Sequence, residues 1–176
     1  DTFLAFSSGA ELDPRYLSTL EEGLHMTAQY LAKAIARDGE GANCLIEIKV
    51  EGTQSDSDAH LVARTIASSS LVKTAIHGSD PNWGRIIAAL GRTGIFFKIS
   101  DVQLWIGPYE IFDNGLPLDF DRQTVRNFMK ARLKGKYLID DLISIRLRVG
   151  KGKGLATAWG CDLSDQYVRI NADYTT

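Results

Sequence analysis

The sequence is poor in the features that mark several classes of protein. It has two cysteines, Cys44 and Cys161, far apart and without a Cys-x-x-Cys pair, so we expect free buried thiols and no metal site. It has no apolar run of the length, about 18 residues, that marks a membrane-spanning helix. Lysine and arginine number 20 against 22 acidic residues, and a net charge of −2 argues against a nucleic-acid surface. The first residues lack the basic segment of a signal peptide. Free buried thiols are typical of a reducing compartment, so we expect the cytoplasm.

Common catalytic and nucleotide-binding motifs are also missing. The chain has no Gly-x-Ser-x-Gly, His-Glu-x-x-His or Walker sequence. Three histidines, His25, His60 and His77, are scattered without metal-ligand spacing, which indicates surface or helix-capping roles. Alternating glycine and lysine over 150–154 resemble a phosphate-binding loop. The segment lies between two predicted strands rather than before a helix, so a hairpin turn is favoured.

Apolar periodicity predicts a long helix near the start of the chain. A short strand is expected over 3–8, and Asp13 with Pro14 then provides an N-cap and a first helical turn. From there to Gly39, the expected end, apolar residues recur every three or four positions and should face a core. They are Leu17, Leu20, Leu24, Ala28, Leu31 and Ile35.

The remaining chain mixes strands and helices without strict alternation. Strand patterns cover 46–50, 102–106, 109–112, 143–149 and 155–159. Helix patterns begin near Ser55, at Asp80 and at Asp121. The last two strands are expected to form the hairpin. These elements predict an α+β protein in which mixed sheets are backed by helices in a layered sandwich, with 1–176 as a single unit.

Two segments contain residue types that folding alone does not require. Glu40 stands between glycines, which allow unusual backbone angles and close approach of a ligand. A glycine-terminated helix with a solvated Glu40 would give the same pattern. At 78–85, Asn, Trp, Gly and Arg follow a helix start whose amides could bind a substrate carboxylate. A capped helix with a packed Trp83 is the structural alternative.

The tail of the chain is a third such segment. Chain ends are usually polar and frayed, but this one stays apolar or aromatic at Tyr167, Val168, Ile170 and Tyr174. We therefore expect it to be docked, with Asn171 and Thr176 facing something polar.

Three blocks of sequence together resemble the ornithine acetyltransferase (glutamate N-acetyltransferase) family. The first is Asp-Gly-Glu-Gly-Ala at 38–42, and the second is the run 71–85, which ends in His-Gly-Ser-Asp-Pro-Asn-Trp-Gly-Arg. The third comprises 157–163 and 167–176. They occur in the family's order and at similar spacing, so the resemblance covers essentially the whole chain and implies the family's fold.

The resemblance implies a concrete reaction in arginine biosynthesis. Members of the family cleave themselves into two chains, and the new N-terminal threonine of the second chain is the nucleophile. N2-acetylornithine acylates this threonine, and glutamate then accepts the acetyl group. A terminal amine can serve as base for its own hydroxyl. The oxyanion donors belong to the first chain, so an α partner and an α2β2 heterotetramer are expected.

Residue by residue, the family pattern assigns substrate binding to Glu40, Asn171 and Thr176. It assigns no catalytic residue to this chain, because the threonine nucleophile is expected upstream of Asp1. No metal or cofactor is implied, although acetyl-CoA is a co-substrate of some members. The chain departs from the family's usual residues at Cys44 and at 6–9.

Three alternatives stay open. The protein is either the form that transfers acetyl only between ornithine and glutamate, or the bifunctional form that also uses acetyl-CoA. A relative from a β-lactam pathway is a further member with the same chemistry. A catalytically inactive assembly module is the alternative from a different class, although the retained Glu40 and the apolar tail argue against it.

Overall fold

The computed structural model describes residues 4–11 and 13–173. The chain divides into two compact units, Asp1–Ala32 and Lys33–Thr176. The first unit contributes an irregular segment and most of a long helix. The second contains the end of that helix and all strands of the described residues.

The long helix begins where the sequence predicts. The Asp13 carboxylate accepts a hydrogen bond from the backbone N of Arg15 at 2.9 Å and caps a 3-10 turn, Pro14–Tyr16, from which α1, Leu17–Arg37, continues. Residues 4–8 are irregular, so the strand predicted over 3–8 is wrong there, and Phe3 lies outside the described residues. A strand needs a partner for its backbone groups, and residues 4–8 belong to no sheet of the described chain.

The apolar stripe of α1 is not a core face in the described chain. Leu20 is 58% exposed and Ile35 is also 58% exposed, and no residue of α1 is buried. The prediction that this stripe faces a core is therefore wrong for these residues. Apolar residues spaced three and four apart indicate a helix, but the spacing does not show which surface covers the apolar stripe.

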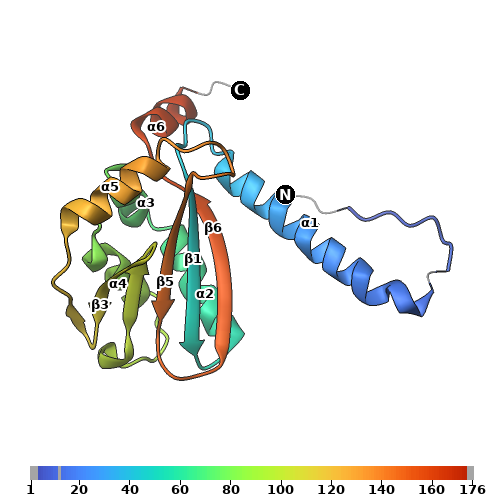
Figure 1. Ribbon diagram of the computed structural model, residues 1–176, viewed down its shortest axis with the longest axis horizontal. Coiled ribbons are helices and arrows are strands. Elements are labelled where there is room, and N and C mark those ends of the chain that lie inside the picture. Colours follow the sequence, from blue (N-terminus) through green and yellow to red (C-terminus); the bar gives the residue numbers. More distant parts are fainter. Residues whose placement is uncertain (1–3, 12, 174–176) are drawn as a thin grey trace. The chain divides into compact units, whose positions relative to one another are not determined.

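Six strands form one mixed sheet in the second unit (Figure 1), in the order β4-β3-β2-β5-β1-β6. They are β1 Leu45–Thr53, β2 Gln103–Ile106, β3 Tyr109–Asp113, β4 Leu116–Pro117, β5 Leu142–Arg148 and β6 Gly154–Cys161. β1 and β5 are parallel, and the other neighbours are antiparallel. The prediction of an α+β protein with a mixed sheet is confirmed.

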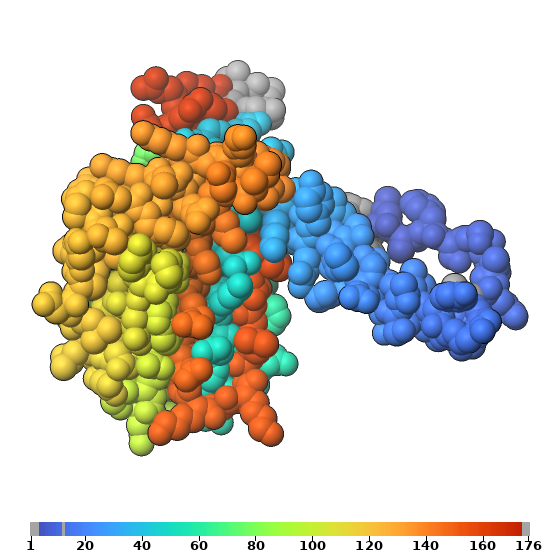
Figure 2. Space-filling view, viewed as in Figure 1, coloured from blue at the N-terminus to red at the C-terminus, as the bar shows by residue number. Residues whose placement is uncertain are grey.

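The central strands β1 and β5 align their apolar rows. Ile46 lies opposite Ile143, and Ile48 lies opposite Ile145. Alternate residues of a strand point to the same face, so these side chains share one face of the sheet. All four are fully buried. Side chains of β1, β5 and β6 form the surface on the opposite face, which is turned to the viewer in Figure 2.

Among the described residues, five further α-helices accompany the sheet: α2 Asp56–Ala67, α3 Ser70–His77, α4 Trp83–Gly91, α5 Arg122–Arg132 and α6 Asp165–Ala172. A 3-10 turn, Ile99–Asp101, precedes β2. α2 and α5 begin near Ser55 and Asp121, as predicted, and these two side chains cap them. The third predicted helix, α4, begins after Asn82, which caps it, rather than at Asp80. α3 and α6 were not predicted. In Figure 1, α2, α3 and α4 lie behind the sheet, and α2, α3, α4 and α5 contribute residues to the common apolar core.

The expected hairpin between β5 and β6 is wrong. β1 lies between them in the sheet, so residues 149–153 cross over the end of β1. Glycines make this crossover fit: a Cβ on Gly152 would lie 2.0 Å from the carbonyl O of Thr53, and one on Gly154 would lie 2.3 Å from that of Ser55. The Gly152 amide donates to the Gly52 carbonyl at 2.8 Å. This glycine pattern is therefore explained by backbone packing, without a phosphate.

Candidate functional site

Residues 38–43, between α1 and β1, form a tight turn, the Glu40 turn. Gly41 has a φ of +82°, and a Cβ on it would lie 2.7 Å from the backbone N of Tyr167. A Cβ on Gly39 would lie 2.7 Å from the Sγ of Cys161. The glycines on both sides of Glu40 are thus accounted for by close contact with α6 and the end of β6.

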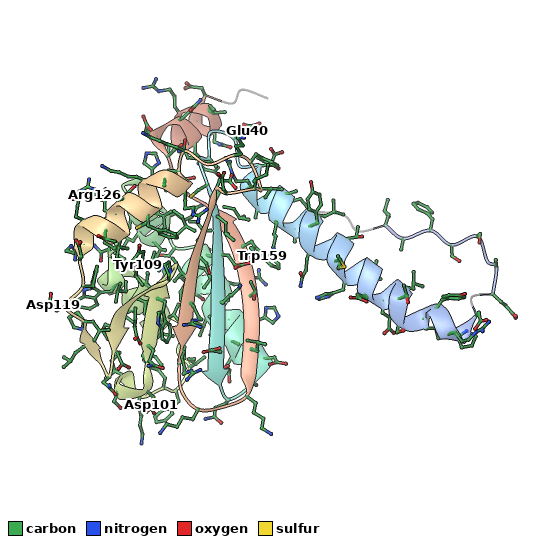
Figure 3. The ribbon with its side chains drawn as sticks, in the orientation of Figure 1. Glu40, Asp101, Tyr109, Asp119, Arg126 and Trp159 are labelled. Atoms are coloured by element: carbon green, nitrogen blue, oxygen red, sulfur yellow. The ribbon has the colours of Figure 1, made fainter. Side chains whose placement is uncertain are left out.

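The backbone of the Glu40 turn is held by side chains, whereas Glu40 itself is exposed. Arg37 donates through Nη1 to the Ala42 carbonyl at 2.9 Å and through Nη2 to the Asn43 carbonyl at 3.0 Å. Ser164 donates through Oγ to the Gly41 carbonyl at 2.7 Å. Figure 3 shows Glu40 at the end of the sheet where α6 lies. The Glu40 carboxylate forms no ion pair or hydrogen bond within residues 4–11 and 13–173.

Arg37 is itself fixed by a buried acid. Its Nε donates to Oδ2 of Asp141 at 2.5 Å, and the Asp141 side chain is fully buried. The other oxygen of Asp141 accepts from the backbone N of Leu138 at 2.9 Å. Tyr137 lies under the guanidinium, 5.4 Å from its carbon to the ring centre. A planar guanidinium with several fixed acceptors has a single orientation, so Arg37 gives the turn a rigid support.

A second buried acid, Asp162, follows β6. Its Oδ1 accepts from the backbone N of Asn43 at 2.7 Å and from that of Cys44 at 3.1 Å. Its Oδ2 lies 3.0 Å from Nδ2 of Asn43 and 3.0 Å from Nδ1 of His77. The carboxylate is fully buried, so these four contacts replace its hydration.

Helix α6 carries one of the predicted site residues. Its cap, Ser164, accepts from the backbone N of Tyr167 at 2.8 Å through the same Oγ that donates to the Glu40 turn. Asn171 lies one helical turn after Tyr167 and donates through Nδ2 to the Tyr167 carbonyl at 2.9 Å, with its side chain exposed. The structure thus places Glu40 and the helix of Asn171 at the same end of the sheet. Thr176 lies outside the described residues.

The expected docking of the tail is wrong in part. Tyr167 is half-buried against the Glu40 turn, and Lys73 lies over its ring at 5.3 Å. Val168 is 52% exposed, and no residue of α6 is buried. The prediction for Tyr174 falls outside the described residues.

The segment 78–85 is explained by packing. Asn82 caps α4 by accepting from the backbone N of Arg85 at 3.1 Å, and Trp83 packs on Phe112 with ring centres 5.5 Å apart. Arg85 donates to the Leu71 carbonyl at 2.9 Å. The structural interpretation is confirmed for these side chains.

Sequence reasoning missed two polar clusters. His77 was interpreted as a surface or capping histidine, yet it meets Asp162, 85 positions away. Glu47, on β1, is 4% exposed and accepts from Nε1 of Trp159 at 3.0 Å. Lys49 pairs with Glu47 at 2.9 Å. The first cluster joins the end of α3 to the residue after β6, and the second joins β1 to β6, so both form only in the folded chain.

The two thiols lie at the end of the sheet that adjoins the Glu40 turn, Cys44 just before β1 and Cys161 at the end of β6. Burial raises the pKa of the Cys44 thiol far above its ordinary value, and the negative charge of Asp162 adds to the effect. Burial also raises the pKa of the Cys161 thiol, against the opposing charge of Lys73. Both cysteines are free and buried, as predicted. Neither is therefore suited to act as a thiolate nucleophile.

A separate cavity of about 700 Å³ lies against the crossover 149–153. Asp101, Arg148, Lys151 and Lys153 are among its lining residues, so both signs of charge face it. Figure 3 shows Asp101 at the opposite end of the sheet from Glu40. Neither Glu40 nor Asn171 lines this cavity.

The described residues contain neither a metal-binding cluster nor a membrane-spanning helix. No group of three or more histidine, cysteine, aspartate or glutamate side chains within residues 4–11 and 13–173 is arranged to hold a metal ion. Among the same residues, no helix combines the length and apolar character that crossing a membrane requires.

Comparison with known proteins gives consistent matches. The ArgJ family profile matches residues 1–176. The arginine biosynthesis bifunctional protein ArgJ of Prochlorococcus marinus (strain NATL2A) is 84% identical over 176 residues, 100% of this chain and 42% of that protein. The protein of the same name from Parasynechococcus marenigrum (strain WH8102) is 54% identical over 176 residues, again 100% of this chain and 41% of that protein. The chain therefore spans about two fifths of the length of these curated relatives.

A solved structure supports the same relationship. The crystal structure of arginine biosynthesis bifunctional protein argJ from Bacillus halodurans matches with a TM-score of 0.83 and 39% sequence identity, covering 93% of this chain and 74% of that chain. The resemblance found in the sequence and the predicted fold class are both confirmed by this match.

Proposed function

Because this chain belongs to the ArgJ family, we propose that it is one part of an acetyltransferase of arginine biosynthesis. In this proposal the complete enzyme moves the acetyl group of N2-acetylornithine to glutamate. The chain supplies substrate-binding groups, and the rest of the enzyme supplies the nucleophile and the oxyanion donors. The support is the family match, together with a held turn whose Glu40 carboxylate has no partner among the described residues.

The transfer proceeds through two acyl exchanges. The hydroxyl oxygen of an N-terminal threonine, outside residues 1–176, attacks the acetyl carbonyl of N2-acetylornithine while its terminal amine takes the hydroxyl proton. The carbon–nitrogen bond breaks, the proton passes to the departing ornithine nitrogen, and an acetyl-threonine ester remains. The amine of glutamate then attacks this ester, and the threonine oxygen leaves and regains its proton.

Glu40 is proposed to bind the substrate ammonium group. Arg37, Ser164 and Asp162 fix the carbonyls and amides around Glu40, yet its own carboxylate has no partner among the described residues. A fixed backbone with a free carboxylate loses little conformational entropy when it binds a cation. N2-acetylornithine carries such a cation on its side chain, and glutamate does not.

Asn171 and Thr176 are proposed as the further substrate contacts from the tail. The Asn171 side chain is exposed on α6, which contacts the Glu40 turn. An amide both donates and accepts hydrogen bonds, which suits the carboxylate of either amino acid. No metal or redox cofactor takes part in the proposed steps.

The complete enzyme is proposed to form by self-cleavage of a precursor and to assemble as an α2β2 heterotetramer. Acetyl-CoA is the second candidate donor, and the word bifunctional in the names of the relatives favours it. Adding acetyl-CoA and glutamate to the complete enzyme, without acetylornithine, tests this donor directly: N-acetylglutamate should appear.

The decisive test of Glu40 is a matched pair of variants in the complete enzyme. Glu40→Gln should raise KM for acetylornithine by about tenfold or more, as expected for one charge-assisted hydrogen bond of roughly 1.5–3 kcal/mol. KM for glutamate should change less. Asp38→Asn, an exposed acid in the same turn, is the control for a general effect of charge. Equal effects of the two variants would contradict a specific role for Glu40.

A further inference from the structure

His77 forms an orienting pair with Asp162. It is the last residue of α3, and its Nδ1 lies 3.0 Å from Oδ2 of the fully buried Asp162 carboxylate. Its other nitrogen, Nε2, lies 3.8 Å from Oδ1 of Asp165, at the start of α6, and 36% of the His77 side chain is exposed. A carboxylate at one ring nitrogen holds the proton there and fixes the ring orientation.

We propose that His77 is a positioning residue for the Glu40 turn and acts through Asp162, an inference that rests on the proposed function of Glu40. Asp162 contacts both the end of the Glu40 turn and His77 of α3. Its Oδ1 accepts from the backbone amides of Asn43 and Cys44, at 2.7 and 3.1 Å. Its Oδ2 is shared between the Asn43 side chain and His77, each at 3.0 Å.

The hydrogen bond from His77 fixes the rotation of the carboxylate. Without it, the Asn43 side chain is the one partner left to Oδ2 among the described residues. The carboxylate, whose Oδ1 accepts from two backbone amides, is then less restricted in rotation. Asn43 closes the Glu40 turn, so a rotation of Asp162 displaces the backbone that presents Glu40. The imidazole therefore acts on the position of a binding group and not on the reacting atoms.

A second contact places α3 against the same segment. The backbone N of Leu163 donates to the Lys73 carbonyl of α3 at 3.3 Å, and Lys73 lies over the Tyr167 ring at 5.3 Å. His77, at the end of α3, thus contacts both Asp162, just after β6, and Asp165, at the start of α6. Loss of its hydrogen bond should weaken substrate binding more than turnover.

Two substitutions at His77 separate its two nitrogens. In His77→Asn, the side-chain amide reaches the position of Nδ1 and can still donate to Asp162. In His77→Gln, the amide reaches the position of Nε2, and the hydrogen bond to Asp162 is lost. Steady-state kinetics of the complete enzyme should give a KM for acetylornithine near the wild-type value for H77N and severalfold higher for H77Q, with kcat within about twofold in both.

The variant Glu40→Gln and the double variant E40Q/H77Q complete the test. If His77 acts through the Glu40 turn, H77Q should add no further rise in KM once Glu40 is changed, because the two effects share one route. A normal KM for E40Q alone would show that the proposed function of Glu40 fails. If E40Q raises KM but H77Q either leaves KM unchanged or adds its full effect in the double variant, only the role of His77 is overturned.

The remaining outcomes are also decisive. Impaired H77N with normal H77Q would mean that Nε2 acts directly and would overturn the positioning role. Equal losses of kcat and melting temperature in both variants would show that His77 is merely structural, which would overturn the proposal as well.

Discussion

Asn43 meets both oxygens of the Asp162 carboxylate from 119 positions away: its backbone N lies 2.7 Å from Oδ1 and its Nδ2 lies 3.0 Å from Oδ2. Sheet register explains the pairing. Leu45, at the start of β1, lies opposite Cys161, at the end of β6, so the residue before one strand faces the residue after the other. The entry of β1 and the exit of β6 are thereby joined at the Glu40 turn.

Replacing Asp162 by asparagine should destabilise the protein. An asparagine amide presents an NH2 group where a carboxylate oxygen accepts hydrogen bonds, so at least one buried donor is left unsatisfied. We expect a loss of about 3 kcal/mol in the free energy of unfolding. Urea denaturation of the complete protein measures it, with Asp119→Asn, an exposed acid, as the control. Equal stability of the two variants would contradict the role given to Asp162.

Gly41 offers a second test of the same turn. Alanine there would require a φ of +82° and place a Cβ 2.7 Å from the backbone N of Tyr167. We expect Gly41→Ala to lower the melting temperature by several degrees and to raise KM for acetylornithine. Gly23 lies in the middle of α1 with open space around it, so Gly23→Ala should be neutral or stabilising by up to about 1 kcal/mol. A tolerated alanine at Gly41 would mean that the turn does not need its contact with α6.

Local patterns predicted most elements but not their pairing. The helix starts at Ser55 and Asp121 were predicted because a capping side chain and the helix that it caps are adjacent in sequence. The β5–β6 hairpin was wrong because strand alternation does not say which strands are neighbours. Only the sheet order shows β1 between them. α6 was missed because its apolar residues, Val168 among them, do not mark a buried face.

Site residues could be predicted only where a local sequence pattern or the resemblance to a family pointed to them. Composition left Glu40 open between a solvated residue and a ligand contact, and resemblance selected the second. His77 gave no signal, because its partner Asp162 is distant in the chain and helix-end histidines are common for other reasons. Arg37 was passed over for the same reason, since Asp141 lies 104 positions away. Such pairs exist only once the strands are assembled.

The isolated chain provides a direct test of where the chemistry lies. Purified residues 1–176 alone should convert no acetylornithine and glutamate into ornithine and acetylglutamate, because the proposed nucleophile and oxyanion donors lie elsewhere. Product formation followed by mass spectrometry measures this, with the complete enzyme as the positive control. Turnover by the isolated chain would overturn the proposed division of roles.

Cys44 should be the slower of the two cysteines to react with iodoacetamide in the folded protein. Only the thiolate reacts. Burial and the negative charge of Asp162 raise the pKa of the Cys44 thiol, and the positive charge of Arg37 offsets only part of this rise. Burial raises the pKa of the Cys161 thiol too, but Lys73 acts against it. Timed alkylation at pH 8 followed by peptide mapping should therefore find label at Cys161 first, and at Cys44 at a normal rate only in denaturant.

The same shift predicts how stability depends on pH. A thiol whose pKa is raised in the folded state stays protonated there, whereas in the unfolded chain it ionises above its ordinary pKa of about 8.5. The unfolded state then binds fewer protons than the folded state, so the free energy of unfolding falls as pH rises above that value and is unaffected below it. Cys44→Ala should remove part of this fall, and urea denaturation at pH 7 and pH 10 measures the difference. An identical fall in the variant would show that Cys44 ionises as readily in the folded protein as in the unfolded one.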